Sequence, residues 1–330
     1  MRTLAIFAVF VAFSGSSQPA WAWGERGHHA ICDVATRLVK EPVLKQYLSS
    51  RGHMLGHVCN IPDISWRSLG HPEPLSDSAH FINAEKGNLT ADSVPLSIAS
   101  YVDSLKTAPD GSSDVTERAE ELGSLWWRGD QFYRYAVKAI VERDAAEPGT
   151  PTPKFEEAVY FFTVGLGLLG HFVGDASQPY HNSVNYDGWQ NGHGGIHSFY
   201  ESVCVDELET GFEKTIFEKA RPLKAYEGSV VSVLKQVSVA SSAERAAIDA
   251  ADKVLEPSKE KERVKARREA PDKACGAFTE LIETQLARAA AQLAALWDRA
   301  YVDAGRPELS KYHSYRYPLK PDHVPVDYLP

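Results

Sequence analysis

The 330-residue sequence lacks several features that would point directly to a particular chemistry. Its four cysteines include no C-x-x-C pair, which disfavours zinc knuckles and thioredoxin-like redox chemistry. No G-x-S-x-G motif occurs, so nothing supports a serine nucleophile. Lys and Arg total 35 against 44 Asp and Glu, and the net charge of −9 argues against binding a polyanion by a generally basic surface. The function must therefore be sought in a site.

Long apolar runs are also scarce, and the most prominent one lies at the start of the sequence. Met1-Arg2 precedes an apolar run at 4–13 that is too short to span a bilayer, and Ala20-Trp21-Ala22 has the small-x-small form of a cleavage site. We predict a secretory signal over residues 1–22, cleaved before Trp23, and a secreted or periplasmic protein. An uncleaved anchor is the alternative; we disfavour it because no second apolar stretch approaches the roughly 20 residues of a transmembrane helix.

Export changes how the cysteines are interpreted, because disulfides form and persist in oxidising compartments. Four cysteines allow three pairings, and the sequence alone leaves these open, together with the alternative of buried free thiols. The cysteines are Cys32, Cys59, Cys204 and Cys275.

Apolar residues recur at i, i+3 and i+4 through most of the chain, which predicts an all-α protein with few or no strands. The predicted helices cover 28–40, 96–107, 114–146, 153–174, 211–220, 228–254 and 272–304, and Pro42 is expected to open a further short element. Residues 50–95 and 176–200 are predicted to be poorly helical. We predict one helical domain over 23–304 and a Pro-rich tail over 305–330. The charge-dense run 256–269 is expected to be a solvated helix face or a mobile connector.

Histidines and carboxylates carry the most chemical information. His171 and Asp175 are four apart in a predicted helix, so they share one face and could bind one metal ion. His181 follows from the next turn, and His197 and Glu201 repeat the four-residue spacing. The alternative for the first pair is a core histidine beside a helix-capping aspartate. Two such pairs close together in the chain favour a metal site, because they are the ligand types that zinc takes.

Cleavage before Trp23 would add a less common set of ligands. The new α-amine, with a pKa near ~8, is readily deprotonated by a metal, and with its own carbonyl oxygen it can form a chelate. His28 follows five residues later. The alternative is a frayed terminus beside a surface histidine.

Three motifs together resemble the zinc-dependent phospholipase C / S1–P1 nuclease superfamily. They are Trp-Gly-x-x-Gly-His at 23–28, His-Phe-x-Gly-Asp-x-x-Gln-Pro-x-His at 171–181 and His-x-x-x-acid at 197–201. The resemblance covers the ligand-bearing regions from 23 to about 205. It implies an all-α fold of the phospholipase C/P1 nuclease type, in which three zinc ions serve the hydrolysis of phosphate esters.

Carried onto this sequence residue by residue, the resemblance implies three zinc ions per chain. Their ligands would be Trp23, His28 and the bridging Asp175 for the first; Asp175, His171, His80 and Asp63 for the second; and His181, His197 and Glu201 for the third. Asp63 would also orient or deprotonate the nucleophile. Asp77 is a rival for Asp63, and His71 is a rival for His80.

The proximity that the resemblance implies for His28 and Asp63 also bears on the disulfides. If His28 and Asp63 serve neighbouring zinc ions, Cys32 and Cys59 also come together, which predicts a Cys32–Cys59 bridge and, by elimination, a Cys204–Cys275 bridge.

The two branches of this superfamily differ in substrate. The Trp-Gly-x-x-Gly-His opening and the stretch at 59–67 resemble the S1–P1 nucleases, whereas Glu201, where those nucleases usually carry Asp, and the short 181–197 gap resemble the phospholipases. We predict a secreted zinc-dependent phosphodiesterase that uses a metal-activated water, an S1/P1-type endonuclease acting on single-stranded nucleic acids and 3′-nucleotides. Candidates for base stacking, or alternatively for the core, are Trp66, Tyr186, Trp189 and Tyr200.

Two other functions are open alternatives to this prediction. One is a phospholipase C that cleaves phospholipid headgroups, and the other is a non-catalytic extracellular zinc-binding protein. Nucleic acid or phospholipid would enter as substrate, and no stable macromolecular partner and no transmembrane anchor are implied.

Overall fold

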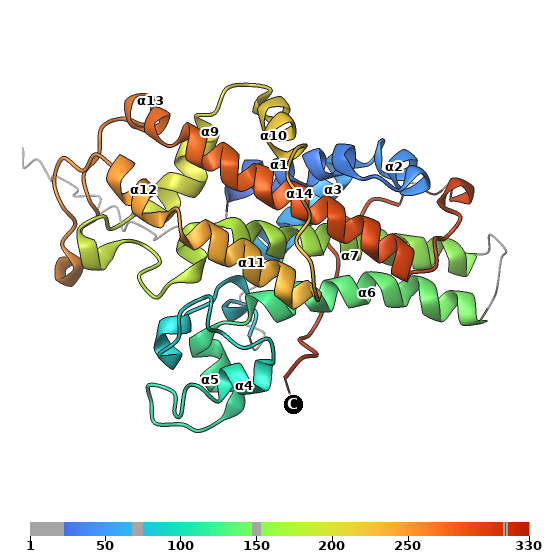
Figure 1. The fold of residues 1–330 in the computed structure, drawn as a ribbon, viewed down its shortest axis with the longest axis horizontal. Helices are drawn as coiled ribbons and strands as arrows, with labels where there is room; N and C mark the ends of the chain where they lie inside the picture. The colour runs from blue at the N-terminus through green and yellow to red at the C-terminus, as the bar shows by residue number, and fades with distance from the viewer. Residues whose placement is uncertain (1–22, 68–74, 147–152, 313, 315, 330) are drawn as a thin grey trace, which may run out of the picture.

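Helices make up most of the chain in the computed structural model, which describes residues 23–67, 75–146, 153–312, 314 and 316–329 (Figure 1). In these ranges the α-helices are α1 (Gly24–Leu38), α2 (Pro42–Leu48), α3 (Gly52–Ile61), α4 (Ile98–Val102), α5 (Val115–Leu122), α6 (Leu125–Ala146), α7 (Pro153–Ser177), α8 (Ile196–Ser198), α9 (Cys204–Asp206), α10 (Phe212–Ala220), α11 (Val230–Ser242), α12 (Arg245–Ala251), α13 (Pro271–Ala274) and α14 (Thr279–Asp303). Among the described residues, β-structure is limited to two isolated bridges. The predicted all-α class is confirmed.

Helix α7 lies at the centre of the bundle. It runs beside α6 and also contacts α1, α3, α11 and α14 (Figure 1). Its segment Lys154–Ser177 is long and apolar enough to cross a membrane, which corrects the expectation that no second stretch approaches that length. The share of its most apolar window that is buried among other helices is 83%, so packing within the bundle accounts for its apolar character.

Glycines on α7 let the neighbouring helices approach closely. A Cβ atom at Gly165 would lie 2.8 Å from the Cβ of Ala136 in α6, and one at Gly167 would lie 2.6 Å from Cγ1 of Val58 in α3. At Gly174 the added atom would lie 2.7 Å from Cε1 of His28 in α1. The absence of side chains at these positions therefore brings a candidate ligand of α1 against α7.

Three predicted helices are interrupted in the structure, 272–304 among them by the 3₁₀ turn Cys275–Ala277, and one helix lies where loops were expected. The range 114–146 divides into α5 and α6 at Gly123, whose φ of +79° is left-handed and whose Cβ would lie 2.1 Å from the Phe81 carbonyl oxygen. The range 228–254 divides into α11 and α12. Helix α3 falls within 50–95; its His and Gly content masks the buried series Leu55, Val58 and Cys59.

The charge-dense run 256–269 is neither a helix face nor a mobile connector, which corrects that expectation. Its two arms pair, because the Leu255 N–H donates to the Arg267 carbonyl over 2.8 Å and the Lys259 N–H donates to the Val264 carbonyl over 2.9 Å. The Ala266 N–H then donates to the Gly194 carbonyl over 2.9 Å. The run is thus a hairpin fixed against the loop that precedes His197.

One of the two predicted disulfides is present. Cys204 and Cys275 are bonded, whereas Cys32 and Cys59 are buried free thiols, so the predicted Cys32–Cys59 bridge is wrong. The expected proximity does hold: a Cβ at Gly170 would lie 2.4 Å from the Cys32 sulfur and 3.2 Å from the Cys59 sulfur. Burial raises the pKa of Cys59, with a hydrogen bond to Cys32 acting in the same direction, so the protonated thiol is favoured there.

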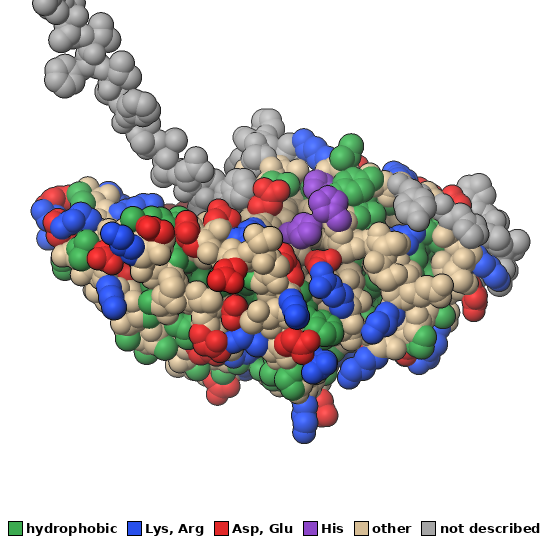
Figure 2. Space-filling model, turned by 90° about the horizontal axis from the view of Figure 1, so that it is seen from above, with side chains coloured by type: hydrophobic (Ala, Val, Ile, Leu, Met, Phe, Trp, Pro, Cys, Tyr) green, Lys and Arg blue, Asp and Glu red, His purple; other side chains and the backbone are tan. Residues whose placement is uncertain are grey.

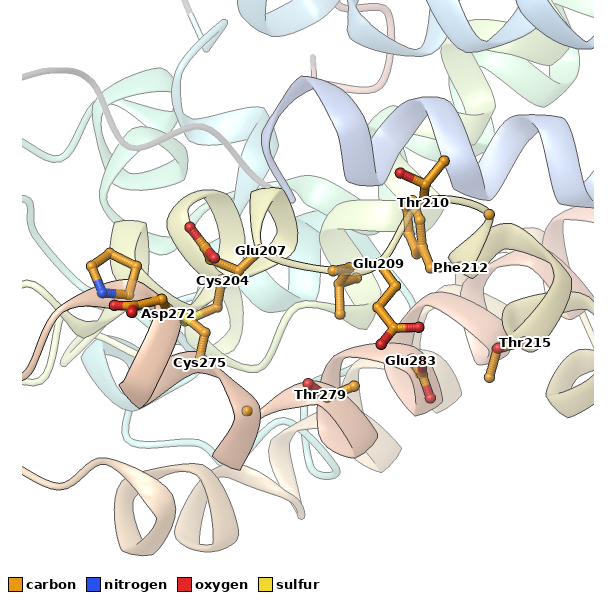
Figure 3. Close-up of a pocket in the computed structure, with 14 residues that line it drawn as sticks. Cys204, Glu207, Glu209, Thr210, Phe212, Thr215, Asp272, Cys275, Thr279 and Glu283 are labelled. Carbon is orange, nitrogen blue, oxygen red and sulfur yellow. A yellow bond between two sulfur atoms is a disulfide. The ribbon is translucent and has the colours of Figure 1, made fainter.

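A cavity of about 470 Å³ lies beside the Cys204–Cys275 bond (Figure 3). Acidic side chains surround it, and Glu283 is also paired with Lys219 over 3.4 Å. None of the predicted ligands lines this cavity, so the candidate site lies elsewhere.

Candidate metal centre

The eight predicted side-chain ligands converge in three buried groups. Within each group the potential ligand atoms lie within 4.8 Å of one another, and every residue is at most 5% exposed. The first group is His28, His171 and Asp175; the second group is Asp63, His80 and His171; the third group is His181, His197 and Glu201. Each of the three groups could hold a metal ion.

Asp175 joins the first group to the second. It lies near the end of α7, and its Oδ1 is 3.4 Å from Nε2 of His28 in α1. Its Oδ2 is 2.9 Å from Nδ1 of His80 and 3.3 Å from Nε2 of His171. One carboxylate therefore faces histidines from three segments, which is the arrangement expected of a bridging ligand.

Asp63, rather than Asp77, reaches the second group. It lies in the π-helix Pro62–Trp66 that continues α3, and its Oδ1 is 3.7 Å from Nδ1 of His80 and 3.8 Å from Nε2 of His171. The Asp77 side chain is 71% exposed and pairs with Arg67. His71, the rival of His80, lies outside the described residues, and His80 occupies the expected place.

The third group is built from two short helices and a turn. His197 lies in α8, and Glu201 lies in the π-helix Phe199–Val203 that follows it. Nε2 of His197 is 2.8 Å, and Nε2 of His181 is 3.8 Å, from the same Glu201 oxygen. Gln178 donates a hydrogen bond to that oxygen over 2.6 Å, which orients the carboxylate.

The inner nitrogens of two histidines are held by backbone carbonyls. Nδ1 of His171 donates to the Cys59 carbonyl over 2.8 Å, and Nδ1 of His181 donates to the His80 carbonyl. These bonds point Nε2 of each ring into its group. In metal-binding histidines the ring N–H that does not bind the metal is held by the same kind of hydrogen bond.

Several atoms that face one another in these groups are buried without a hydrogen-bond partner. Desolvated polar atoms of this kind are costly unless something compensates them, and a cation bound to nitrogen and oxygen would do so. They are His28 Nε2, Asp63 Oδ2, Asp175 Oδ1, His181 Nε2, His197 Nε2 and Glu201 Oε1. The donor set therefore fits zinc on chemical grounds.

Burial sets the protonation states of the third group. It lowers the pKa of His181 and of His197 to about 4, so both rings are in the neutral form that binds metals. Burial also raises the pKa of Glu201 well above its usual value, so the carboxyl retains a proton in the absence of a cation.

In the first and second groups, neighbouring charges oppose the effect of burial on the pKa values. Burial lowers the pKa of His28 and of His80. Burial acts in the same direction on His171, but the charges of Asp175 and Asp63 outweigh it and raise the pKa of that ring. The histidines in turn outweigh burial at Asp175 and hold its pKa well below the usual value. The Asp175 carboxylate is therefore anionic, the form that could bind a cation.

Trp23 is fixed beside the first group. Its indole N–H donates to the Gly174 carbonyl over 2.9 Å and to the Ser177 hydroxyl over 3.0 Å, in the last turn of α7. Its carbonyl accepts the Gly27 N–H over 3.1 Å. The predicted signal, residues 1–22, lies outside the described residues, so cleavage and the α-amine ligand stay predictions.

A cavity of about 330 Å³ opens onto the second and third groups. It is lined by Arg67, Asp77, His80, Phe81, Asn83, Tyr180, His181, Tyr186 and His197. Sequence reasoning missed Phe81, Asn83 and Tyr180, although Phe81 and Asn83 directly flank the His80 motif. Among the stacking candidates, Tyr186 is 49% exposed at this cavity, whereas Trp66 and Tyr200 are buried.

Neither the surface of the molecule nor the comparison with known proteins assigns a function to this site. Acidic and basic side chains are interspersed over the face in Figure 2, with a small group of histidines among them. No protein-family model and no curated protein matches the chain. Any assignment of function therefore rests on the residues of the site.

Proposed function

We propose that the chain is a zinc-dependent phosphodiesterase of the S1/P1 nuclease type, acting on single-stranded nucleic acids and 3′-nucleotides. One observation carries this proposal: buried, unpartnered ligand atoms lie in three His/carboxylate groups, two of which adjoin a cavity that also presents a guanidinium and an exposed aromatic ring. The proposal includes three zinc ions per chain and export after cleavage before Trp23.

The second and third groups adjoin the cavity, and Trp23 with His28 completes the first. Zinc bound there supplies Lewis acidity toward phosphate oxygens and lowers the pKa of a bound water. Asp63 is anionic, because its histidine neighbours outweigh burial and lower its pKa, so it can accept a proton or orient the attacking oxygen. Asp63 also receives a hydrogen bond from Arg67 over 3.3 Å.

Arg67 is the cation best placed to meet a phosphate. It lines the cavity, and its guanidinium spans Asp63 and the exposed Asp77. A fork of N–H donors suits phosphate oxygens, and the positive charge stabilises the negative charge that develops in the transition state.

The remaining lining favours a nucleotide over a cationic headgroup. Tyr186 presents a half-exposed ring 5.8 Å from the His197 ring, where a base could stack next to the phosphate site. A choline group would require an uncommitted carboxylate or an aromatic cage, and Asp77 is already paired with Arg67. A phospholipase C is the second candidate, favoured by Glu201 as the terminal ligand of the third group.

The direct test uses zinc-loaded protein beginning at Trp23, assayed in parallel on single-stranded DNA, RNA, a 3′-nucleotide and phosphatidylcholine vesicles. We expect hydrolysis of the nucleic acids and the 3′-nucleotide. Tyr186→Ala should raise KM about tenfold, because stacking on one ring contributes about 1–3 kcal/mol. Faster hydrolysis of the vesicles would establish the phospholipase instead. Zinc binding with no hydrolysis of any of the four would establish a non-catalytic zinc-binding protein.

A further inference from the structure

The last part of the chain is an extended segment laid across the bundle. Residues 316–329, here called the C-terminal strap, follow the 3₁₀ turn Leu309–Lys311 and contain no α-helix. At its far end Tyr328 hydrogen-bonds the Ser124 hydroxyl over 2.9 Å, and Asp327 forms a two-point pair with Arg134 over 2.8 and 2.7 Å. The strap is therefore anchored to α6.

The carbonyl groups of the strap serve buried donors of the bundle. The indole N–H of Trp66 donates to the Pro321 carbonyl over 3.1 Å. Arg128 and Gln131 of α6 donate to the Val324 and Pro325 carbonyls, each over 2.6 Å. These three side chains are at most 5% exposed, so loss of the strap would leave buried donors, including a charged one, without these acceptors.

Trp66 connects the strap to the second metal group. It ends the π-helix that carries Asp63, and it directly precedes Arg67. The His323 ring of the strap meets the Trp66 ring edge-on at 5.1 Å, and Trp66 stacks on Phe132 at 5.8 Å.

The ring contacts continue from there to the ligands. Phe132 stacks on Phe172 at 5.4 Å, and Phe172 contacts the rings of both His80 and His171, at 5.5 and 5.0 Å. A continuous series of rings therefore runs from the strap to two histidines of the second group.

The strap also touches the segment that leads to His80. Val326 and Leu329 pack against a small apolar cluster that contains Leu75. The Ser124 N–H donates to the Ser78 carbonyl over 2.9 Å, and Ser78 opens the 3₁₀ turn that carries His80. Two of the three segments that carry the second group, at 62–66 and 75–80, thus rest on the strap or on its anchor.

We infer that the C-terminal strap is a positioning segment for the second metal group, and that Trp66 is the residue through which it acts. The inference rests on the proposed function, because it assigns metal binding to that group. The series of ring contacts ends at His80 and His171, and the strap reaches the third group through the His80 carbonyl that holds His181. The strap should therefore affect metal affinity at the second group much more than at the third.

The test titrates the full-length chain with zinc while the imidazole NMR signals of His80, His171, His181 and His197 are followed separately. Trp66→Phe keeps a ring against Phe132 but removes the donor to Pro321. His323→Ala combined with Tyr328→Ala removes the ring contact to Trp66 and the hydrogen bond to Ser124. In both variants we expect half-saturation of His80 and His171 to need about 10-fold more zinc, the lower end of the loss that follows when a group supporting a metal ligand is removed. His181 and His197 should shift by less than about twofold.

Leu319→Ala is the matched control, because that strap side chain is 73% exposed and its backbone carbonyl is kept. It should leave all four titrations unchanged. Thermal unfolding of the same samples separates positioning from general stability. If the variants weaken both groups equally, or shift neither, the inference is overturned while the proposed function stands. If the wild-type imidazoles do not respond to zinc at all, the proposed function and the inference fail together.

Discussion

At the scale of single residues, Asp175 has the largest influence on the site. Its two oxygens face His28, His80 and His171, and it is completely buried. A carboxylate between two dications also eases the repulsion between them. We therefore expect the charge of Asp175 to contribute to metal binding independently of the shape of its side chain.

Asp175→Asn keeps the shape and removes that charge. We expect the variant to lose the metal ions of the first and second groups and to retain the one in the third, so that zinc per chain falls from three to one. Metal analysis after dialysis measures this. Asp130→Asn, at a surface pair with Arg134 over 2.8 Å, is the control and should keep three ions. Retention of three ions by Asp175→Asn would rule out a shared carboxylate.

Glu201 gives a prediction about pH. Because burial raises its pKa in the native state, the native protein holds a proton that the unfolded chain releases above its ordinary value of 4.5. In metal-free protein the buried Glu201 therefore costs no stability through its charge below pH 4.5. As pH rises from there toward the native pKa, the free energy of unfolding falls by about 1.4 kcal/mol per pH unit.

Glu201→Gln should remove this decline. Urea unfolding in the presence of a chelator, at pH 5 and at pH 8, should show the free energy of unfolding of the wild type falling relative to that of the variant. Saturating zinc should abolish the difference in slope, because the cation takes the place of the proton. Parallel behaviour of the two metal-free proteins would contradict the prediction.

At the scale of elements, α7 contributes both to the hydrophobic core and to the candidate metal centre. It carries His171 and Asp175, and its glycines admit the side chains of the helices around it. A small change of volume on this helix should therefore affect a ligand as well as packing.

Gly174→Ala tests this directly. The new Cβ would lie 2.7 Å from the His28 ring, so His28 must move, whereas alanine itself favours the helix by up to about 1 kcal/mol. We expect loss of zinc from the first group, measured as two ions per chain in place of three, with little change at the third group. Gly276→Ala, where nothing lies within 4 Å of the added atom, should keep all three. An unchanged zinc content in Gly174→Ala would show that His28 is not needed for binding.

The disulfide ties α9 to the segment before α14. Cys204 and Cys275 are 71 residues apart, and on the chain-entropy model a bridge closing such a loop stabilises the native state by about 4 kcal/mol. Replacing both cysteines by serine should lower the free energy of unfolding by that amount, as measured by urea denaturation. Peptide mapping under non-reducing conditions should find Cys32 and Cys59 as free thiols. A Cys32–Cys59 peptide would contradict the structure.

At the scale of the whole molecule, the sequence predicts which histidines and carboxylates come together better than it predicts their surroundings. The i, i+4 pairs were visible because helical spacing places His171 with Asp175 and His197 with Glu201. The choice of Asp63 over Asp77 needed the structure, since both lie near basic or histidine residues in the sequence. Helix α3 was missed because its glycines and histidines mask a short buried series.

Long-range contacts explain most of what remained hidden. Gly123 divides α5 from α6 because the Phe81 backbone passes against it, and no local pattern reports that contact. The hairpin at 256–269 and the strap at 316–329 are held by backbone atoms bonding to distant residues, which composition does not encode. The free thiols of Cys32 and Cys59 lie together as expected, but proximity alone did not determine whether they bond.

The position of α14 in the chain has a consequence for how the protein matures. All the candidate ligands lie between residues 23 and 201, yet α1 and α7 both pack against α14 at Thr279–Asp303. Because the chain is synthesised from its amino terminus, every candidate ligand emerges before α14, the helix against which α1 and α7 pack. Metal binding by these groups would therefore be a late step in the maturation of the chain, after α14 has been made.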